Sequence, residues 1–248
     1  MPGSNAIPQT FTTVESGFML APGVEDEFWR TSESMNLVAA RQPGFNAVIG
    51  GPIANSSWSY FCGKFDTPDD MDAWYRNVEH KPVMRKAYST WFNAFYIRKW
   101  RLPAEGEAVT GPLFCETVIL PELALDESAV HATVESLKVA LPMYRALPVE
   151  TLTEVFEDQP FQFIGPVHEF PVVAPVRYLL NTYWDTGEEL NAWLASSEMA
   201  RLCELGEVSS QVNVQILHAP GQRNSLSSDG SRRAWVRPSA RHRTITRK

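Results

Sequence analysis

The feature that most constrains this chain is a short stretch that occurs twice. The segment DTPDDMDAW begins at Asp66, and the segment DTGEELNAW begins at Asp185. Both open with Asp-Thr and close with Ala-Trp, and the residues between are similar in kind. The interval between them is close to half of the 248-residue chain. Self-similarity at a long interval is typical of a duplicated structural unit.

A second match supports the duplication. The tetrapeptide TVES stands at residues 13–16 and again at residues 133–136, at nearly the same interval as the first pair. Either match alone is short enough to arise by chance, but their intervals agree. We therefore predict one domain at residues 10–110, a second at 111–220, and a flexible tail at 221–248.

Each unit is predicted to contain a strand, a helix, two strands, a helix and a final strand. The β-branched and apolar runs favour strands at residues 12–20, 46–50, 58–65 and 95–102, and at 133–141, 177–184 and 211–218. Helices are expected at residues 24–41 and 149–158, and after the helix caps expected at Asp66 and Asp185.

The order β-α-β-β-α-β is that of a ferredoxin-like unit, so the fold class is α+β. The sheet of such a unit has helices on one face only, and its other face needs a cover. Two units in one chain can cover each other. We therefore predict two tandem ferredoxin-like units that form a pseudo-twofold α+β barrel, with residues 113–121 as the strand that connects them.

Composition and charge exclude several classes. The whole chain carries 22 basic and 29 acidic residues, whereas residues 221–248 carry eight basic residues and one acidic residue. The rest of the chain is therefore acidic, which does not suit nucleic-acid binding. No apolar run has the length of a membrane span. Three cysteines without metal-ligand spacing favour reduced thiols, no metal site and a cytoplasmic protein.

The two copies differ at one chemically active residue. Trp74 recurs as Trp193, but Met199 stands where the first copy has His80. A duplicated fold needs its tryptophan twice for packing, whereas it does not need the histidine twice. His80 precedes Pro82 by two residues, which predicts a place at a helix C-terminus where the charged form is favoured. His80 is therefore a candidate for function, and a surface histidine is the alternative.

Other polar residues are weaker candidates. The pair Glu15 and Glu135 recurs in the TVES segments; solvent-facing positions are favoured for both, and inward-facing carboxylates are the alternative. Three basic residues near the end of the first unit are expected to face water or an anionic ligand group: Arg98, Lys99 and Arg101. His168 could line a cavity. No nucleotide-binding, zinc-protease or hydrolase motif is present.

The stretch DDMDAW followed by VEH, at residues 69–74 and 78–80, resembles the antibiotic biosynthesis monooxygenase family. The resemblance covers both units loosely and implies ferredoxin-like α+β barrels that often dimerise, so a second copy is an expected partner. It implies His80 and Trp74 as catalytic residues. The implied substrate-binding residues are Asn77, Tyr88, Trp91, Trp193 and His168. The family's frequent asparagine in the first strand is absent here, which weighs against its cofactor-free mechanism.

The length and duplication look most like ring-opening oxygenases of angucycline pathways. That resemblance implies oxidative carbon–carbon cleavage of a polycyclic aromatic polyketide by dioxygen, with reduced flavin (FADH2) as cofactor or with none. The expected role of His80, with a nearby Arg or Lys, is to stabilise phenolate or peroxide charge. The alternatives are a non-enzymatic binding protein for a hydrophobic metabolite and a haem-binding or haem-degrading relative.

Overall fold

The computed structural model describes residues 12–54, 56–121, 127–137, 161–172 and 177–216. The first half contains β1 (Thr12–Leu20), α1 (Glu25–Ala39), β2 (Phe45–Pro52), β3 (Ser59–Phe65), α2 (Pro68–Arg76), α3 (His80–Lys86), the π-helical turn η1 (Ala87–Trp91) and β4 (Phe92–Arg101). The second contains β5 (Thr110–Pro121), α4 (Glu127–Leu137), β6 (Phe161–Ile164), β7 (His168–Phe170), β8 (Tyr178–Thr186), α5 (Gly187–Leu194), α6 (Ser197–Cys203) and β9 (Gly206–Gln215).

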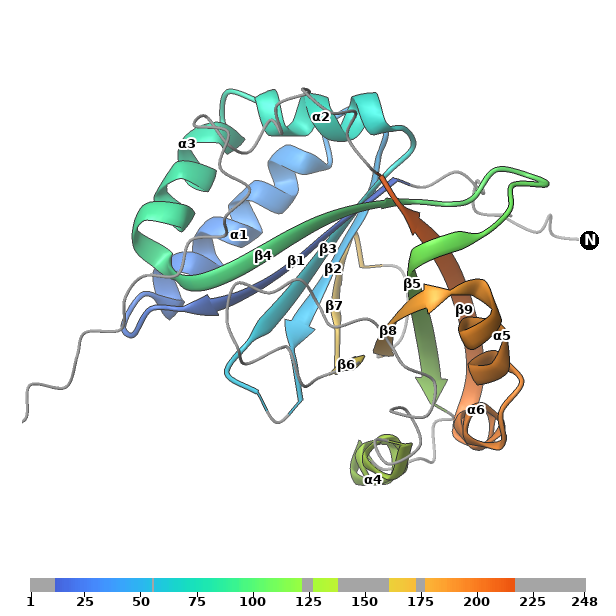
Figure 1. Ribbon diagram of the computed structural model, residues 1–248. Helices are drawn as coiled ribbons and strands as arrows, with labels where there is room; N and C mark the ends of the chain where they lie inside the picture. The colour runs from blue at the N-terminus through green and yellow to red at the C-terminus, as the bar shows by residue number, and fades with distance from the viewer. Residues whose placement is uncertain (1–11, 55, 122–126, 138–160, 173–176, 217–248) are drawn as a thin grey trace, which may run out of the picture.

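The strands form one antiparallel sheet in the order β6-β8-β5-β9-β4-β1-β3-β2-β7. The order β4-β1-β3-β2 in the first unit matches β9-β5-β8-β6 in the second, which is the ferredoxin-like arrangement. The two ends of the sheet meet, because β7 pairs with β2 and Ile53 bridges to Ile164 at the end of β6. The predicted α+β barrel is therefore confirmed, with the helices of each unit on its outer face (Figure 1).

The start of the second unit differs from the prediction. Its first strand is β5, which we expected to be a connector, and residues 133–137 are helical in α4. The physical reason is visible in the buried residues Val130, Val134 and Leu137, whose spacing of four and three follows a helical face. The TVES match was therefore wrong as an anchor. The predicted helix at 149–158 and the basic segment 221–248 lie outside the described residues.

The repeated DTP and DTG segments do occupy equivalent places. Each lies between a third strand and the helix that follows, α2 or α5. The caps are the threonines and not the aspartates: Thr67 accepts from the backbone N–H of Asp70, and Thr186 accepts from that of Glu189. The predicted caps were therefore one residue too early. Sequence alone did not distinguish the two, because a Thr hydroxyl can accept this bond as well as an Asp carboxylate can.

The barrel interior is filled with side chains from both units. Inward-facing positions alternate along the strands with positions that face the helices. The interior apolar cluster includes Trp58, Tyr60, Tyr96, Trp100, Phe114, Leu179 and Tyr183. Among the described residues, no helix has the length and apolar character that crossing a bilayer requires.

Candidate functional site

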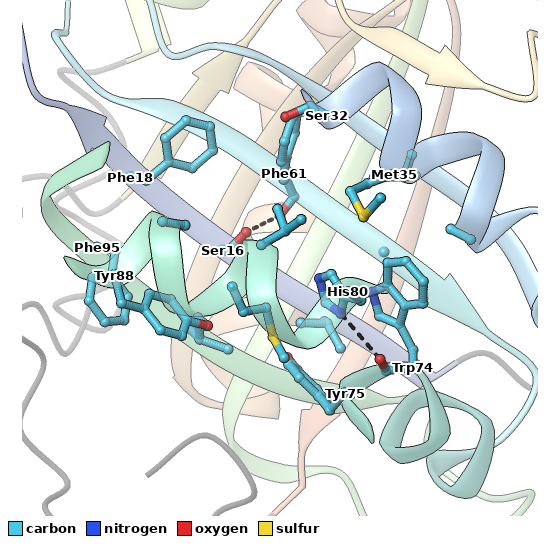
Figure 2. Close-up of a pocket in the computed structure, with 18 of the residues that line it drawn as sticks. Ser16, Phe18, Ser32, Met35, Phe61, Trp74, Tyr75, His80, Tyr88 and Phe95 are labelled. Atoms are coloured by element: carbon cyan, nitrogen blue, oxygen red, sulfur yellow. Dashed lines mark hydrogen bonds between the residues drawn. The ribbon is translucent and has the colours of Figure 1, made fainter. Parts of the chain in front are cut away.

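A cavity of about 190 Å³ lies in the first unit, between the outer face of its sheet and the helices α1, α2 and α3 (Figure 2). Strand residues such as Val14, Phe18 and Phe61 form one wall, and helix residues such as Met35 and Met84 form the other. The described lining contains aromatic and aliphatic side chains with a few neutral polar groups, and no Lys, Arg, Asp or Glu. An apolar cavity with few polar groups is the usual form of a small-molecule site.

His80 lines this cavity because the chain turns sharply before it. α2 ends at Asn77, whose backbone leaves the helical region at φ −55° and ψ 133°. The Asn77 side-chain oxygen accepts from the backbone N–H of Glu79 at 2.8 Å and of His80 at 3.1 Å. The turn places the His80 ring on Trp74, with the ring centroids 3.9 Å apart and the planes inclined by 14°.

One hydrogen bond sets the tautomer of His80. Its Nδ1 lies 3.1 Å from the backbone carbonyl oxygen of Trp74 (Figure 2). Since a carbonyl can only accept, Nδ1 carries the proton and Nε2 keeps a free lone pair. Within the described part of the chain, Nε2 has no protein partner. The imidazole therefore offers the cavity a hydrogen-bond acceptor.

The imidazole is neutral, contrary to the expectation of a charged form. Burial lowers the pKa of His80 to about 4, and the bond to the Trp74 carbonyl only partly opposes this. His80 also begins α3 and does not end a helix, so the helix dipole disfavours its cation. Pro82 is tolerated because it lies in the first turn of α3, where no backbone N–H is needed.

Two tyrosines belong to the lining. Tyr75 is 6% exposed, and its buried hydroxyl oxygen has no hydrogen-bond partner among the residues that the structure describes. Burial raises the pKa values of Tyr75 and Tyr88 well above the usual value, so both are uncharged phenols. A buried unpaired hydroxyl is costly unless a ligand or water completes it.

The sequence candidates separate into two groups. Tyr88 and Trp91 line the cavity together with His80 and Trp74. Asn77 does not line it and instead holds the turn, and His168 is exposed on β7. Trp193 is buried in the second unit and stacks on Trp184 at 6.1 Å between ring centroids. These three residues therefore do not line the cavity, unlike the other expected substrate-binding residues.

Among the described residues of the second unit, buried side chains occupy the matching place. Trp193, Leu190, Met199 and Leu202 belong to one buried cluster that packs α5 and α6 on the sheet. Met199, which takes the position of His80, is 7% exposed within this cluster. In the second unit, buried side chains thus fill the place of the cavity, and Met199 replaces the histidine.

The sequence reasoning missed a polar network inside the barrel. Glu15, expected to face solvent, is fully buried there and accepts hydrogen bonds from Tyr183, Trp100 and Tyr96. Burial raises the pKa of Glu15, while Arg98 and these bonds lower it in part. The side chain of Glu135 lies outside the described part of the molecule.

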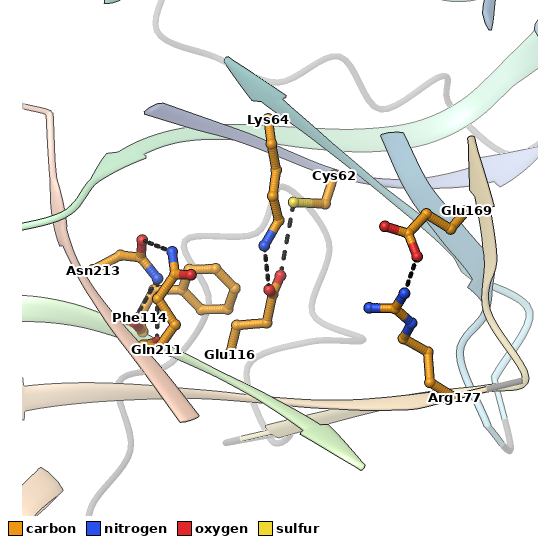
Figure 3. A network of polar contacts seen from close by, with 8 residues as sticks. All are labelled: Cys62, Lys64, Phe114, Glu116, Glu169, Arg177, Gln211 and Asn213. Carbon is orange, nitrogen blue, oxygen red and sulfur yellow. Dashed lines mark hydrogen bonds and ion pairs between the residues drawn. The ribbon is translucent and has the colours of Figure 1, made fainter. Parts of the chain in front are cut away.

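The partner of Glu15 in the repeat is Glu116. Glu15 pairs in the sheet with Cys62 and Arg98, and Glu116 pairs with Asn181 and Gln211 at the corresponding places. Figure 3 shows Glu116 in contact with Lys64 and Cys62 of the first unit. A carboxylate on the central strand of each unit was the signal that could have revealed the network.

The basic residues near the end of the first unit do not reach the cavity. Lys99 pairs with Asp72 at 3.1 Å, and Arg101 pairs with Glu107 at 2.7 Å. Arg98 lies over the rings of Tyr96 and Tyr183 inside the barrel. The expected Arg or Lys beside His80 is therefore missing from the described lining.

The cavity fits neither a resident flavin nor a haem. A cavity of about 150 Å³ holds one benzene ring, and this one is only slightly larger. The three-ring flavin and the four-pyrrole haem both exceed that space. The lining also lacks a cation for flavin phosphates or haem propionates. Among the described residues, no cluster of three His, Cys, Asp or Glu could hold a metal ion.

The fold is a tandem ferredoxin-like α+β barrel with an apolar cavity in its first unit. No protein-family model and no curated protein sequence matches the chain. An aldoxime dehydratase structure is 9% identical and covers 83% of this chain and 81% of its own, with a TM-score of 0.50. A candidate monooxygenase from Lactobacillus acidophilus NCFM is 10% identical over 83% and 94%, with a TM-score of 0.35.

An anthrone oxidase-like protein is 11% identical and covers 85% of this chain and 92% of its own, with a TM-score of 0.32. The neighbours are mostly named as oxidoreductase-type enzymes. Because these identities are so low, the likeness is one of fold. Structures named as monooxygenases are thus among its distant structural neighbours, and the resemblance to the antibiotic biosynthesis monooxygenase family stays a prediction.

Proposed function

We propose that the chain is an oxygenase that binds a flat hydroxylated aromatic molecule in the cavity of its first unit and allows dioxygen to oxidise it. The observation that carries this proposal is the neutral His80, whose free Nε2 faces an aromatic-lined apolar cavity. An acceptor held in fixed orientation and away from charge is suited to bind a neutral hydroxyl group.

The chain's own residues would orient the substrate and exclude water. Aromatic side chains of the lining, among them Trp74, Phe61 and Phe65, offer ring faces and edges to a flat molecule. His80 Nε2 would accept the hydrogen bond of the substrate hydroxyl, which makes the ring more electron-rich. The low pKa of His80 favours this acceptor role over the expected stabilisation of an anion by a cationic pair.

The electrons balance without an added reductant. A hydroxyarene and dioxygen can give a quinone and water: one oxygen atom becomes the second carbonyl, and the other leaves as water with two hydrogens of the substrate. Because the cavity does not fit a flavin, we propose that the substrate supplies all the electrons, although the first strand lacks the asparagine that the resemblance associates with a cofactor-free reaction. Flavin-dependent ring opening of a polycyclic quinone, expected from the sequence, stays a prediction that requires a larger site.

Oxygen consumption tests the proposal. The full chain would be mixed with hydroxyarenes of one to four rings in isotopically labelled dioxygen, with and without reduced flavin. We expect uptake without flavin, with label in both the quinone and the water. His80→Phe should lower turnover about 10-fold or more by removing the acceptor. Binding of the arenes without oxygen uptake in any mixture would instead indicate a binding protein.

The matched control is His168→Phe, the same change at an exposed position of β7 outside the cavity. It should leave oxygen uptake unchanged. An equal loss in both variants would contradict a specific role for His80.

A further inference from the structure

We infer that the cavity selects a neutral aromatic of one or two rings that carries a hydroxyl group for His80. This inference rests on the proposed function and sharpens its substrate class. It replaces the polycyclic substrate that the sequence resemblance implies with a smaller and more polar one.

The size of the cavity sets the number of rings. Its volume is about 190 Å³, against about 150 Å³ for an apolar cavity that accepts one benzene. The difference provides room for substituents or a second fused ring. A four-ring molecule would need the helices to move away from the sheet. The cavity wall is a packed aromatic cluster of Phe18, Phe28, Trp91 and their neighbours, which resists such a movement.

The lining excludes a charged ligand. The described residues around the cavity include no Lys, Arg, Asp or Glu, and His80 is neutral. A carboxylate or sulfate moved from water into such a site would lose its hydration without gaining a counter-charge, so it should bind far more weakly than a neutral group of similar size. The ligand therefore bears hydroxyl, carbonyl or ether groups in preference to ionised ones.

One protein group fixes the polar end of the ligand. His80 Nε2 can only accept, so the ligand donates there. The Tyr75 hydroxyl oxygen has almost no accessible surface, so it does not offer the ligand a second bond. The Ser16 hydroxyl already donates to the Phe61 carbonyl at 3.2 Å, so its proton is not available to the ligand.

Binding without oxygen tests this inference apart from catalysis. Under argon, tryptophan fluorescence and calorimetry would compare alpha-naphthol, naphthalene, naphthoate and hydroxypyrene on the full chain. We expect alpha-naphthol to bind about 3- to 10-fold more tightly than naphthalene because of the bond to His80. Naphthoate and hydroxypyrene should bind much more weakly. Equal or tighter binding of either of these two would overturn the inference.

His80 has its own readout. His80→Phe should abolish the advantage of alpha-naphthol over naphthalene, because the only acceptor that the inference assigns to the ligand hydroxyl is lost. An advantage that persists in His80→Phe would overturn the inference. Because the ligand series is compared on the unaltered protein first, a variant that misfolds does not decide the result. Binding as expected with no oxygen uptake would overturn the oxygenase alone.

Discussion

At the scale of single residues, His80 shows how burial changes a side chain's use. An ordinary histidine is half charged near pH 6.5, but burial lowers the pKa of His80 to about 4. The stacked Trp74 ring and the bond from Nδ1 to the Trp74 carbonyl hold the neutral ring in one orientation. The residue is thereby fixed as an acceptor over the whole neutral range.

This pKa shift predicts a specific pH dependence of stability. Above pH 6.5 the ring is neutral in both states, so the stability is fully present. Between pH 6.5 and about 4 the unfolded chain takes up the proton and the folded chain does not. The free energy of unfolding should fall by roughly 3 kcal/mol across this window. Urea titrations at several pH values, compared with His80→Phe, would isolate the effect.

His80→Phe also controls for the other titrating groups, since the buried carboxyl of Glu15 is present in both proteins. Its raised pKa acts in the opposite sense, stabilising the fold as the pH falls. If the two stability curves ran parallel from pH 7 to pH 4, His80 would not be a buried neutral histidine.

At the scale of elements, the turn between α2 and α3 positions the site. Asn77 ends α2 and accepts from two backbone N–H groups of the turn, and its amide donates to Gln42 at 3.0 Å. Asn77→Ala should therefore cost about 1–2 kcal/mol of stability. It should also weaken alpha-naphthol binding, although Asn77 does not line the cavity. Urea unfolding and fluorescence titration would measure the two effects.

Asn46→Ala provides a comparison, because Asn46 also bonds to side chain and backbone nearby but belongs to β2 and not to the turn. It should change stability without changing affinity for alpha-naphthol. Loss of binding in both variants would mean that general destabilisation, and not the turn, controls the site.

The two repeated helix starts give a second prediction for elements. Thr67 and Thr186 cap α2 and α5 by the same bond, at 3.2 Å in both cases. Thr67→Ala and Thr186→Ala should each lower the free energy of unfolding by about 1 kcal/mol, as measured in urea. Similar losses would support equivalent roles. A loss in only one variant would show that the two similar segments cap their helices differently.

These helix starts also show what the sequence could reveal. The DTP and DTG segments combine a cap, an acidic first turn and a buried face, so several local signals agree and the helices were predicted where they lie. TVES combines no such signals. The same four letters form a strand at residues 13–16 and part of a helix at residues 133–136. So short a match cannot distinguish a strand from a helix, and only the spacing of the apolar residues around it does.

The site was partly visible for a related reason. His80 could be singled out because the repeat lacks it, and its neighbours Tyr88 and Trp91 follow on the same segment. Its charge state could not be read, since it depends on long-range burial by the strands beneath it. The buried role of Glu15 was hidden as well, because only closure of the barrel converts a seemingly exposed strand face into an interior.

At the scale of the whole molecule, buried polar contacts join the two units. Glu15 of β1 accepts from Tyr183 of β8, and Glu116 of β5 pairs with Lys64 of β3. The interval from Asp66 to Asp185 also separates Lys64 from Tyr183. Each central-strand carboxylate is thus bound by the same position of the opposite unit's third strand. The pseudo-twofold symmetry is kept in the network while the residue types differ.

The Lys64–Glu116 pair provides the final prediction. The two side chains are 11% and 3% exposed, and although burial alone would lower the pKa of Lys64, the Glu116 carboxylate raises it. Lys64→Met should cost about 3–5 kcal/mol because it leaves a buried charge without its partner, and Glu116→Leu should cost a similar amount. The double variant should recover most of this loss, since no buried charge remains. Urea unfolding followed by both tryptophan fluorescence and circular dichroism would measure the coupling, and purely additive losses would show that the pair does not hold the two units together.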